Sequence, residues 1–450
     1  MNSYELFMSK DKPTDYYVKL REEVLKINEK LNIFNNVSES NKLNGFLFSV
    51  KDNICVKDVE STASSEILKG YIPPFDATVI KKLKEKKGMS FLGKTNMDEF
   101  GFGSFGINCK KPAKNPFDER YVAGGSSSGA AAATSILKYH IAIAESTGGS
   151  ISTPAAFCGV VGFTPTYGLV SRYGLIDYAN SLDKIGVIGR SAEDVEFAYN
   201  LIKGHDKNDT TSLNKEITRE DKNSIILIKE LVDGLSPEVE KEFMHLVEKL
   251  SGMGYAIKNR SMPFIDKAIA SYYIIAMAEA STNLAKYTGF KYGLKNPDIT
   301  QEYNTFFKNV RESFGKESKR RIVLGTFVRS SSVKDLYYSK ALKARAILIK
   351  QMGQILEEGF ILSPVMPIKT PKFEETSTLS ALEVYKTDIL TIPPNLCGFP
   401  HISFPYSYME NMPLGAQLVT KHWNDYALTN FVSNWEKGFN YKFKYNIGSL

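Results

Sequence analysis

The sequence predicts an α/β protein, and the pattern of residues 45–92 is the evidence for this fold class. Residues 45–50 and 89–92 are short apolar runs of the kind that form buried strands. Between them, residues 77–87 carry apolar side chains at helical spacing, and Gly88 ends the pattern. Alternation of strand and helix is typical of an α/β core. A content of 43% hydrophobic and 24% charged residues is ordinary for a globular enzyme.

Two further helices are expected in the first half, besides an amphipathic one near the N-terminus. Thr95, with Asp98 three residues on, is typical of an N-cap and predicts a helix that begins there. Residues 124–129 are rich in glycine and serine but run into four alanines, which favours a tight turn opening a helix over a flexible linker. The N-terminal helix is indicated by apolar residues at helical spacing, which are Leu20, Val24, Ile27 and Leu31.

The second half begins after a polar stretch at residues 204–223. We expect this stretch to be a surface connection between two halves, although a length of 450 alone would suggest about three domains. Residues 224–228 then predict an apolar strand, and residues 238–250 a helix.

Composition excludes several classes of protein. The 57 lysines and arginines exceed the 50 acidic residues by only 7, and they are spread out, unlike the basic stripe of a nucleic-acid-binding module. Four widely spaced cysteines without a C-x-x-C pair argue against a disulfide framework or a zinc site. Neither a signal peptide nor an apolar run of about 18 residues is present, so we expect a cytoplasmic protein.

Two serines and a lysine are the candidate catalytic residues. Ser126 and Ser150 each lie in a glycine-rich run, 24 residues apart, and Lys51 follows the predicted strand 45–50. A serine is a weak nucleophile until a nearby base accepts its proton. The pattern suggests a Ser–Ser–Lys relay, because no histidine lies in a motif-like setting. The histidines are His140, His205, His245, His401 and His422.

The turn before Ser150 is the candidate oxyanion hole. It consists of Thr147, Gly148 and Gly149, and its two glycines allow backbone N–H groups to point at one spot.

Two glycine patterns compete with this interpretation. Residues 101–106 match the dinucleotide pattern G-x-G-x-x-G, but they follow a predicted helix rather than a strand. Residues 125–129 match the nucleophile elbow G-x-S-x-G, but the residues before them form a poor strand. An α/β-hydrolase therefore stays the second interpretation of this run.

Six segments together resemble the amidase signature family. The most distinctive is 148–162, and the others are 93–100, 165–175, 181–186, 319–326 and 413–417. The resemblance spans almost the whole chain and implies the amidase signature fold, with a large mixed central β-sheet flanked by helices.

One amidase domain, residues 1–450, is the organisation that this resemblance implies. It would comprise an N-terminal helical segment (1–44), a catalytic core (45–203), the polar connection (204–223) and a C-terminal half (224–450) that completes a glutamine pocket.

The resemblance also implies roles for individual residues. Ser150 would attack the side-chain amide of glutamine, Ser126 would pass on the proton, and Lys51 would be the terminal base. Arg321 would bind the α-carboxylate and Asp388 the α-amino group, because a guanidinium suits a carboxylate and an aspartate suits an ammonium. A third substrate-binding position matches Tyr272, and each of these three could instead have a structural role.

Within the family, the match is to the glutaminase subunits of tRNA-dependent amidotransferases. The implied function is to supply ammonia for converting Glu-tRNA(Gln) or Asp-tRNA(Asn). The implied partners are an ATP-using, tRNA-binding, kinase-like B subunit and a small bridging C subunit. No cofactor or metal is expected on this chain, since its glycine runs lack the phosphate-loop spacing, and ATP and Mg²⁺ would be used by the partner. The alternatives are a free-standing amidase of small amides and a degenerate scaffold subunit.

Three positions depart from the family pattern. Ser146 stands where many members carry Asp, Ser152 where they often carry Arg, and Val365 where a Thr is common. These departures put the support around the nucleophile in question, but not the relay itself.

Overall fold

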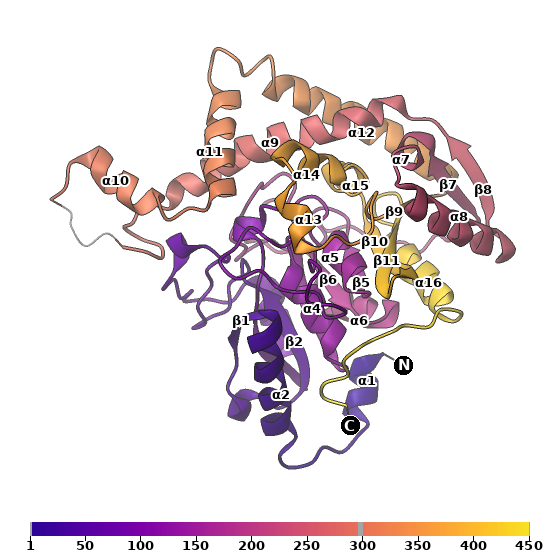
Figure 1. The fold of residues 1–450 in the computed structure, drawn as a ribbon, viewed down its shortest axis with the longest axis horizontal. Helices are drawn as coiled ribbons and strands as arrows, with labels where there is room; N and C mark the ends of the chain where they lie inside the picture. The colour runs from indigo at the N-terminus through magenta and orange to yellow at the C-terminus, as the bar shows by residue number, and fades with distance from the viewer. Residues whose placement is uncertain (1, 296–299, 450) are drawn as a thin grey trace.

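The computed structural model describes residues 2–295 and 300–449, and its centre is a mixed β-sheet (Figure 1). Within these residues, eleven strands join in the order β1-β3-β2-β4-β6-β5-β10-β11-β9-β7-β8. Strand β2 pairs in parallel with β3 and β4, whereas β4 pairs antiparallel with β6, so the predicted mixed sheet is confirmed. The strands are β1 (Phe34–Val37), β2 (Phe46–Lys51), β3 (Met89–Thr95), β4 (His140–Ser146), β5 (Val161–Thr164), β6 (Lys184–Gly189), β7 (Ser224–Ile228), β8 (Ala256–Arg260), β9 (Phe360–Pro364), β10 (His401–Met409) and β11 (Met412–Val419).

Helices surround this sheet. Helices α9, α11 and α12 pack together at one end, the top of Figure 1, and the two chain termini lie near each other at the other end. The helices are α1 (Ser3–Met8), α2 (Tyr16–Leu31), α3 (Thr78–Glu85), α4 (Ser128–Ile136), α5 (Ser152–Phe157), α6 (Ala192–Ile202), α7 (Lys229–Val232), α8 (Pro237–Gly252), α9 (Lys267–Asn283), α10 (Tyr303–Arg311), α11 (Lys316–Arg329), α12 (Tyr338–Glu358), α13 (Phe373–Ser377), α14 (Ala381–Thr387), α15 (Ile392–Leu396) and α16 (Asp425–Glu436).

The elements around the candidate site are buried along their whole length. Every residue of β2, β4 and α4 is buried, which explains the continuous apolar runs in their sequences. The small side chains at 130–133 let α4 pack closely against β4. The expected N-terminal helix, the strand before Lys51, and the helix after the glycine-rich turn are therefore present as α2, β2 and α4.

The prediction of a helix beginning at Thr95 is wrong. Thr95 is the last residue of β3, where it pairs with Lys51 of β2, and only a short 3₁₀ turn, Glu99–Gly101, follows. The Asp98 carboxylate does not cap a helix. It accepts hydrogen bonds from the backbone N–H groups of Gly106 (3.1 Å) and Asn108 (2.7 Å), and so it closes a loop. Sheet pairing continues through Thr95 and outweighs the local capping signal.

The polar stretch 204–223 contains no helix or strand, but two of its acidic side chains are buried. Asp206 accepts hydrogen bonds from Thr78 (2.5 Å) and Ser171 (2.6 Å), and Asp209 accepts one from the backbone of Arg172 (2.8 Å). The connection is therefore fastened to the first half of the chain by charge-assisted hydrogen bonds.

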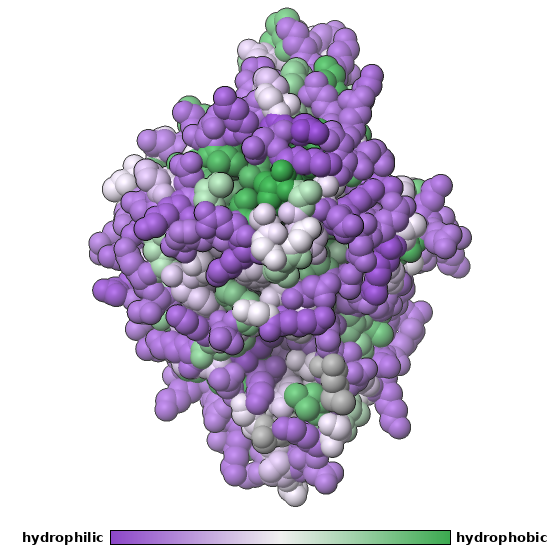
Figure 2. Space-filling model, turned by 90° about the vertical axis from the view of Figure 1, so that its right-hand side faces the viewer, coloured by the Kyte–Doolittle hydropathy of each residue, from purple (hydrophilic) through white to green (hydrophobic). Residues whose placement is uncertain are grey.

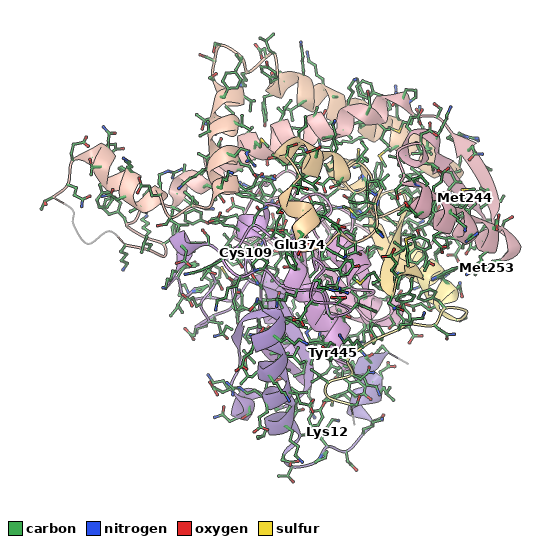
Figure 3. All side chains as sticks on the ribbon, in the orientation of Figure 1. Lys12, Cys109, Met244, Met253, Glu374 and Tyr445 are labelled. Carbon is green, nitrogen blue, oxygen red and sulfur yellow. The ribbon has the colours of Figure 1, made fainter. Side chains whose placement is uncertain are left out.

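The face drawn in Figure 2 is mostly hydrophilic, and its largest apolar patch lies in the upper half. Met244 of α8 and Met253 just after that helix lie at the outer edge of the molecule, and both are partly exposed (Figure 3). Within 2–295 and 300–449, no helix is long and apolar enough to cross a membrane.

Candidate active site

Lys51 ends strand β2 with its side chain fully buried. The parallel pairing of β2 with β4 places it beside the end of β4. Its Nζ atom lies 2.8 Å from Ser126 Oγ, 2.8 Å from the carbonyl oxygen of Glu145 and 2.9 Å from Glu145 Oε2. The predicted lysine and the first predicted serine are thus in direct hydrogen-bond contact.

The loop before α4 places Ser126 at this lysine. The peptide bond between Gly125 and Ser126 is cis, and the carbonyl of Ser126 accepts a hydrogen bond from the backbone N–H of Asp98 (3.1 Å). A Cβ atom on Gly125 would lie only 2.1 Å from Asp98 Oδ2, so a side chain does not fit at this position. Burial raises the pKa of Asp98 to about 6.

Ser150 lies in the turn between β4 and α5. The backbone N–H of Ser127 donates to the carbonyl of Ser150 (3.2 Å), which fastens the two serine-bearing segments together. A cavity of about 10 Å³ is lined by Ser150, Gly125 and Gly149, among others. A Cβ atom on Gly149 would lie 2.4 Å from Thr391 Oγ1, so this turn also requires a glycine.

The expected oxyanion turn has a support that the sequence did not indicate. Asn395 of α15 donates hydrogen bonds from its side-chain nitrogen to the carbonyl oxygens of Thr147 and Leu182. Within the described parts of the chain, the backbone N–H groups of Gly149 and Ser150 donate to no protein acceptor. They are therefore available to an oxyanion formed at Ser150.

Arg321, Asp388 and Tyr272 line the same cavity as Ser150. Arg321 is buried on α11, where its Nε donates to Glu317 (2.9 Å) and its Nη1 contacts the hydroxyl of Tyr178. Its guanidinium carbon lies 4.9 to 5.7 Å from the centres of four aromatic rings, which favours a buried cation.

Asp388 is held by two hydroxyl groups. Its Oδ2 accepts hydrogen bonds from Tyr273 (2.6 Å) and Ser104 (2.8 Å). Burial raises the pKa of Asp388, and these two bonds and Arg321 oppose the rise. Sequence reasoning missed both partners, because Ser104 lies inside the glycine run that resembles a dinucleotide site and Tyr273 is adjacent to the predicted Tyr272.

The three departures from the family pattern are all buried. Ser146 Oγ donates to the carbonyl of Gly148 (2.8 Å), so it supports the turn directly. Ser152 on α5 and Val365 are buried beside the same region. Among the described residues, no group of three His, Cys, Asp or Glu side chains is arranged to hold a metal ion.

The family model described as Amidase matches residues 9–429. The chain belongs to the amidase family. It is 39% identical to the A subunit of the glutamyl-tRNA(Gln) amidotransferase of Sulfolobus acidocaldarius, over 94% of each chain. It is 42% identical to the protein of the same name from Aliarcobacter butzleri, over 88% of this chain and 89% of the relative. The crystal structure of the A subunit of the Thermotoga maritima enzyme matches with a TM-score of 0.81 and 32% identity, over 97% of this chain and 94% of that one.

Proposed function

We propose that this amidase-family chain is the glutaminase subunit of a tRNA-dependent amidotransferase. It hydrolyses glutamine and supplies ammonia for converting Glu-tRNA(Gln), Asp-tRNA(Asn) or both. One observation carries the proposal: a buried guanidinium, Arg321, and a buried carboxylate, Asp388, share one cavity with Ser150. The α-carboxylate and α-amino groups of glutamine match these two charges, and the names of the 38–42% identical relatives agree with it.

The proposed reaction is supported by the Lys51–Ser126 contact and by the backbone hydrogen bond that joins the Ser127 and Ser150 segments. Ser150 Oγ attacks the side-chain carbonyl carbon of glutamine, its proton passes to Ser126 Oγ, and the Ser126 proton passes to Lys51 Nζ. The carbonyl oxygen becomes an oxyanion, which the N–H groups of the 147–150 turn stabilise. Collapse of this tetrahedral oxyanion breaks the carbon–nitrogen bond. The proton returns along the relay to the leaving nitrogen, so ammonia departs. Water then attacks the acyl-enzyme, and glutamate and free Ser150 are regenerated.

Substrate entry requires a rearrangement. The cavity beside Ser150, of about 10 Å³, is too small for glutamine, and a larger one of about 200 Å³ adjoins it, sharing Arg321 and lined also by Glu317 and Tyr385. The Glu317 carboxylate already binds Arg321 and accepts a hydrogen bond from Tyr385 (2.7 Å). The α-carboxylate of glutamine therefore replaces Glu317 on part of the guanidinium, which has enough donors for a bidentate contact.

Arg321→Ala and Asp388→Ala are expected to impair hydrolysis of glutamine far more than hydrolysis of a simple amide without α-substituents. Losing one partner of a desolvated charge pair costs about 2–5 kcal/mol, which is a fall of about 30-fold or more in kcat/KM for glutamine. The measurement is kcat/KM on both substrates. Arg329→Ala, on the exposed side of the same helix, is the matched control. Equal losses on both substrates would show that Arg321 and Asp388 are structural.

The chain is also expected to depend on partners. Its charge excess is spread over the sequence, and no glycine run has phosphate-loop spacing, so ATP use and most tRNA binding come from other subunits. We expect slow glutamine hydrolysis by the chain alone, and amidation of Glu-tRNA or Asp-tRNA only with an ATP-using partner and a small bridging subunit. Ammonia release and tRNA amidation are measured with each combination, with and without ATP. Rapid partner-independent turnover of diverse small amides, with no tRNA product, would favour a free-standing amidase instead.

A further inference from the structure

The three partners of Lys51 Nζ fix the direction in which this amine accepts a proton. One is the backbone carbonyl of Glu145, and another is the Glu145 side chain, whose Oε2 also accepts a hydrogen bond from Asn53 (3.0 Å). Both of these oxygens are acceptors, so they take the two N–H bonds of a neutral amine. Its lone pair then points at the third partner, Ser126 Oγ, 2.8 Å away.

Behind Glu145, a second carboxyl group faces the same hydroxyl. Thr147 Oγ1 lies 2.7 Å from Glu145 Oε1 and 2.8 Å from Asp183 Oδ1. The antiparallel pairing of β4 with β6 brings these residues together, since Glu145 pairs with Ile185, two residues after Asp183. A threonine hydroxyl has one proton and can donate to only one of the two oxygens. The other carboxyl group must therefore carry a proton and donate it to Thr147.

The surroundings of the two carboxyl groups favour Asp183 as the one that carries this proton. Its Oδ2 accepts hydrogen bonds from the backbone N–H groups of Tyr178 and Ala179 (2.9 Å each), which leaves Oδ1 as the protonated oxygen toward Thr147. Glu145 lies against the lysine amine, whereas no lysine or arginine in the described chain forms an ion pair with Asp183. Burial and the nearby charge of Glu145 raise the pKa of Asp183 well above its usual range, although its hydrogen bonds with Thr147 and Ala179 and the charge of Arg172 oppose the rise.

We propose that Glu145 is a positioning residue for Lys51, and that Asp183 stays protonated and hydrogen-bonded to Thr147, so that this pair of carboxyl groups carries one negative charge. This inference rests on the proposed glutamine hydrolysis. When the Ser126 proton moves to Lys51 Nζ, the ammonium gains a third N–H and Glu145 balances its charge. An ionised Asp183 would place a second buried negative charge nearby, hold Lys51 as ammonium, and prevent it from accepting the proton.

Three carboxyl groups bear on the charge of Lys51. Glu145 contacts it directly, Asp183 is linked to Glu145 through Thr147, and Asp98 in the loop after β3 interacts with it electrostatically. The pKa of Asp98 is about 6, so its titration contributes to the acid limb of any pH profile. This contribution is common to the wild type and to Glu145 variants, so a difference between them arises from Glu145 and from Asp183, whose pKa Glu145 raises.

The test compares pH profiles of glutamine hydrolysis by the complex with its partner subunits. Glu145→Gln should lower kcat by about tenfold or more, with KM changed by less than about twofold, because it acts through the base rather than on the substrate. It should also alter the acid limb of the pH profile, since the carboxylate that balances the protonated relay is lost. Asp425→Asn, which alters a buried carboxyl group away from the site, is the control and should leave the limb in place.

Asp183 is tested by a pair of substitutions. Asp183→Ala should lower kcat by about tenfold or more, whereas Asp183→Asn should recover most of it, because the amide N–H donates to Thr147 as the protonated carboxyl does. If Glu145→Gln were the tolerated change and Asp183→Asn the damaging one, the proton would reside on Glu145 and the proposal would be overturned.

A spectroscopic measurement determines the protonation state of Asp183 without an activity assay. In protein with isotope-labelled aspartate carboxyl groups, infrared difference spectra at neutral pH should contain a protonated-carboxyl band that Asp183→Asn removes and Glu145→Gln retains. An unchanged spectrum in Asp183→Asn would overturn the inference. Failure of the wild-type complex to hydrolyse glutamine would instead contradict the proposed function, while this spectrum would still report on Asp183.

Discussion

Ser150→Ala is expected to abolish glutamine hydrolysis, with kcat falling by about 10⁴-fold or more, the scale seen when a serine hydrolase loses its nucleophile. The fold should persist, because the substitution removes one hydroxyl from a side chain that lines a polar cavity. Steady-state ammonia release measures the activity, and a thermal unfolding curve close to that of the wild type shows that the protein remains folded.

The control for this substitution is Ser152→Ala. Ser152 is buried two residues further on, and its Oγ has no hydrogen-bond partner within the described residues, so its loss should have little effect. A glutamine analogue that traps the acyl-enzyme should label Ser150. Labelling of Ser126 or Ser127 would show that the nucleophile is misassigned and would favour the nucleophile-elbow interpretation.

Lys51→Ala is expected to remove most activity, and Lys51→Arg not to restore it. A general base contributes about 10²–10⁴-fold to the rate, and a guanidinium does not release its proton near neutral pH. The alanine variant should also be less stable by about 1–3 kcal/mol or more, because it leaves the buried Glu145 carboxylate without a hydrogen-bond donor. Both kcat and the free energy of unfolding are therefore measured.

Lys94→Met separates the chemical effect from the loss of stability. Lys94 is a second fully buried lysine on the neighbouring strand, 3.7 Å from Asp52, and it makes no contact with either serine of the relay. This variant should lose stability while its folded fraction keeps substantial turnover. Near-normal turnover in Lys51→Arg would refute a proton-accepting role for Lys51.

The residues of the proposed relay could be chosen from the sequence because each has a local signal. Ser126 and Ser150 lie in glycine-rich turns, and Lys51 ends an apolar strand. Their meeting point depends on the pairing of β2 with β4, which joins segments about 90 residues apart and has no local signature. The family resemblance supplied that long-range information, and the same is true of the mixed sheet.

The surroundings of the relay could not be predicted in this way. Glu145 is one acidic residue inside an apolar strand, and only its contact with Lys51 shows its importance. Asn395 and Asp183 reach the oxyanion turn from other elements, 248 and 36 residues away from Thr147. The prediction of a helix at Thr95 was wrong for the opposite reason. Its local capping signal was overridden by the pairing of β3 in the sheet.

The strand order has a consequence for the protein during its synthesis. The outer edge of β5 pairs with His401–Ser403 of β10, so it has no partner until about the last tenth of the chain is made. An unpaired edge strand is a site for pairing with other polypeptides. Asp388 and Asn395 are made only shortly before this segment. A nascent chain that already carries Lys51, Ser126 and Ser150 therefore lacks both the proposed contact from Asp388 and the support that Asn395 gives the Thr147 turn, and we expect glutamine hydrolysis only when translation is almost finished.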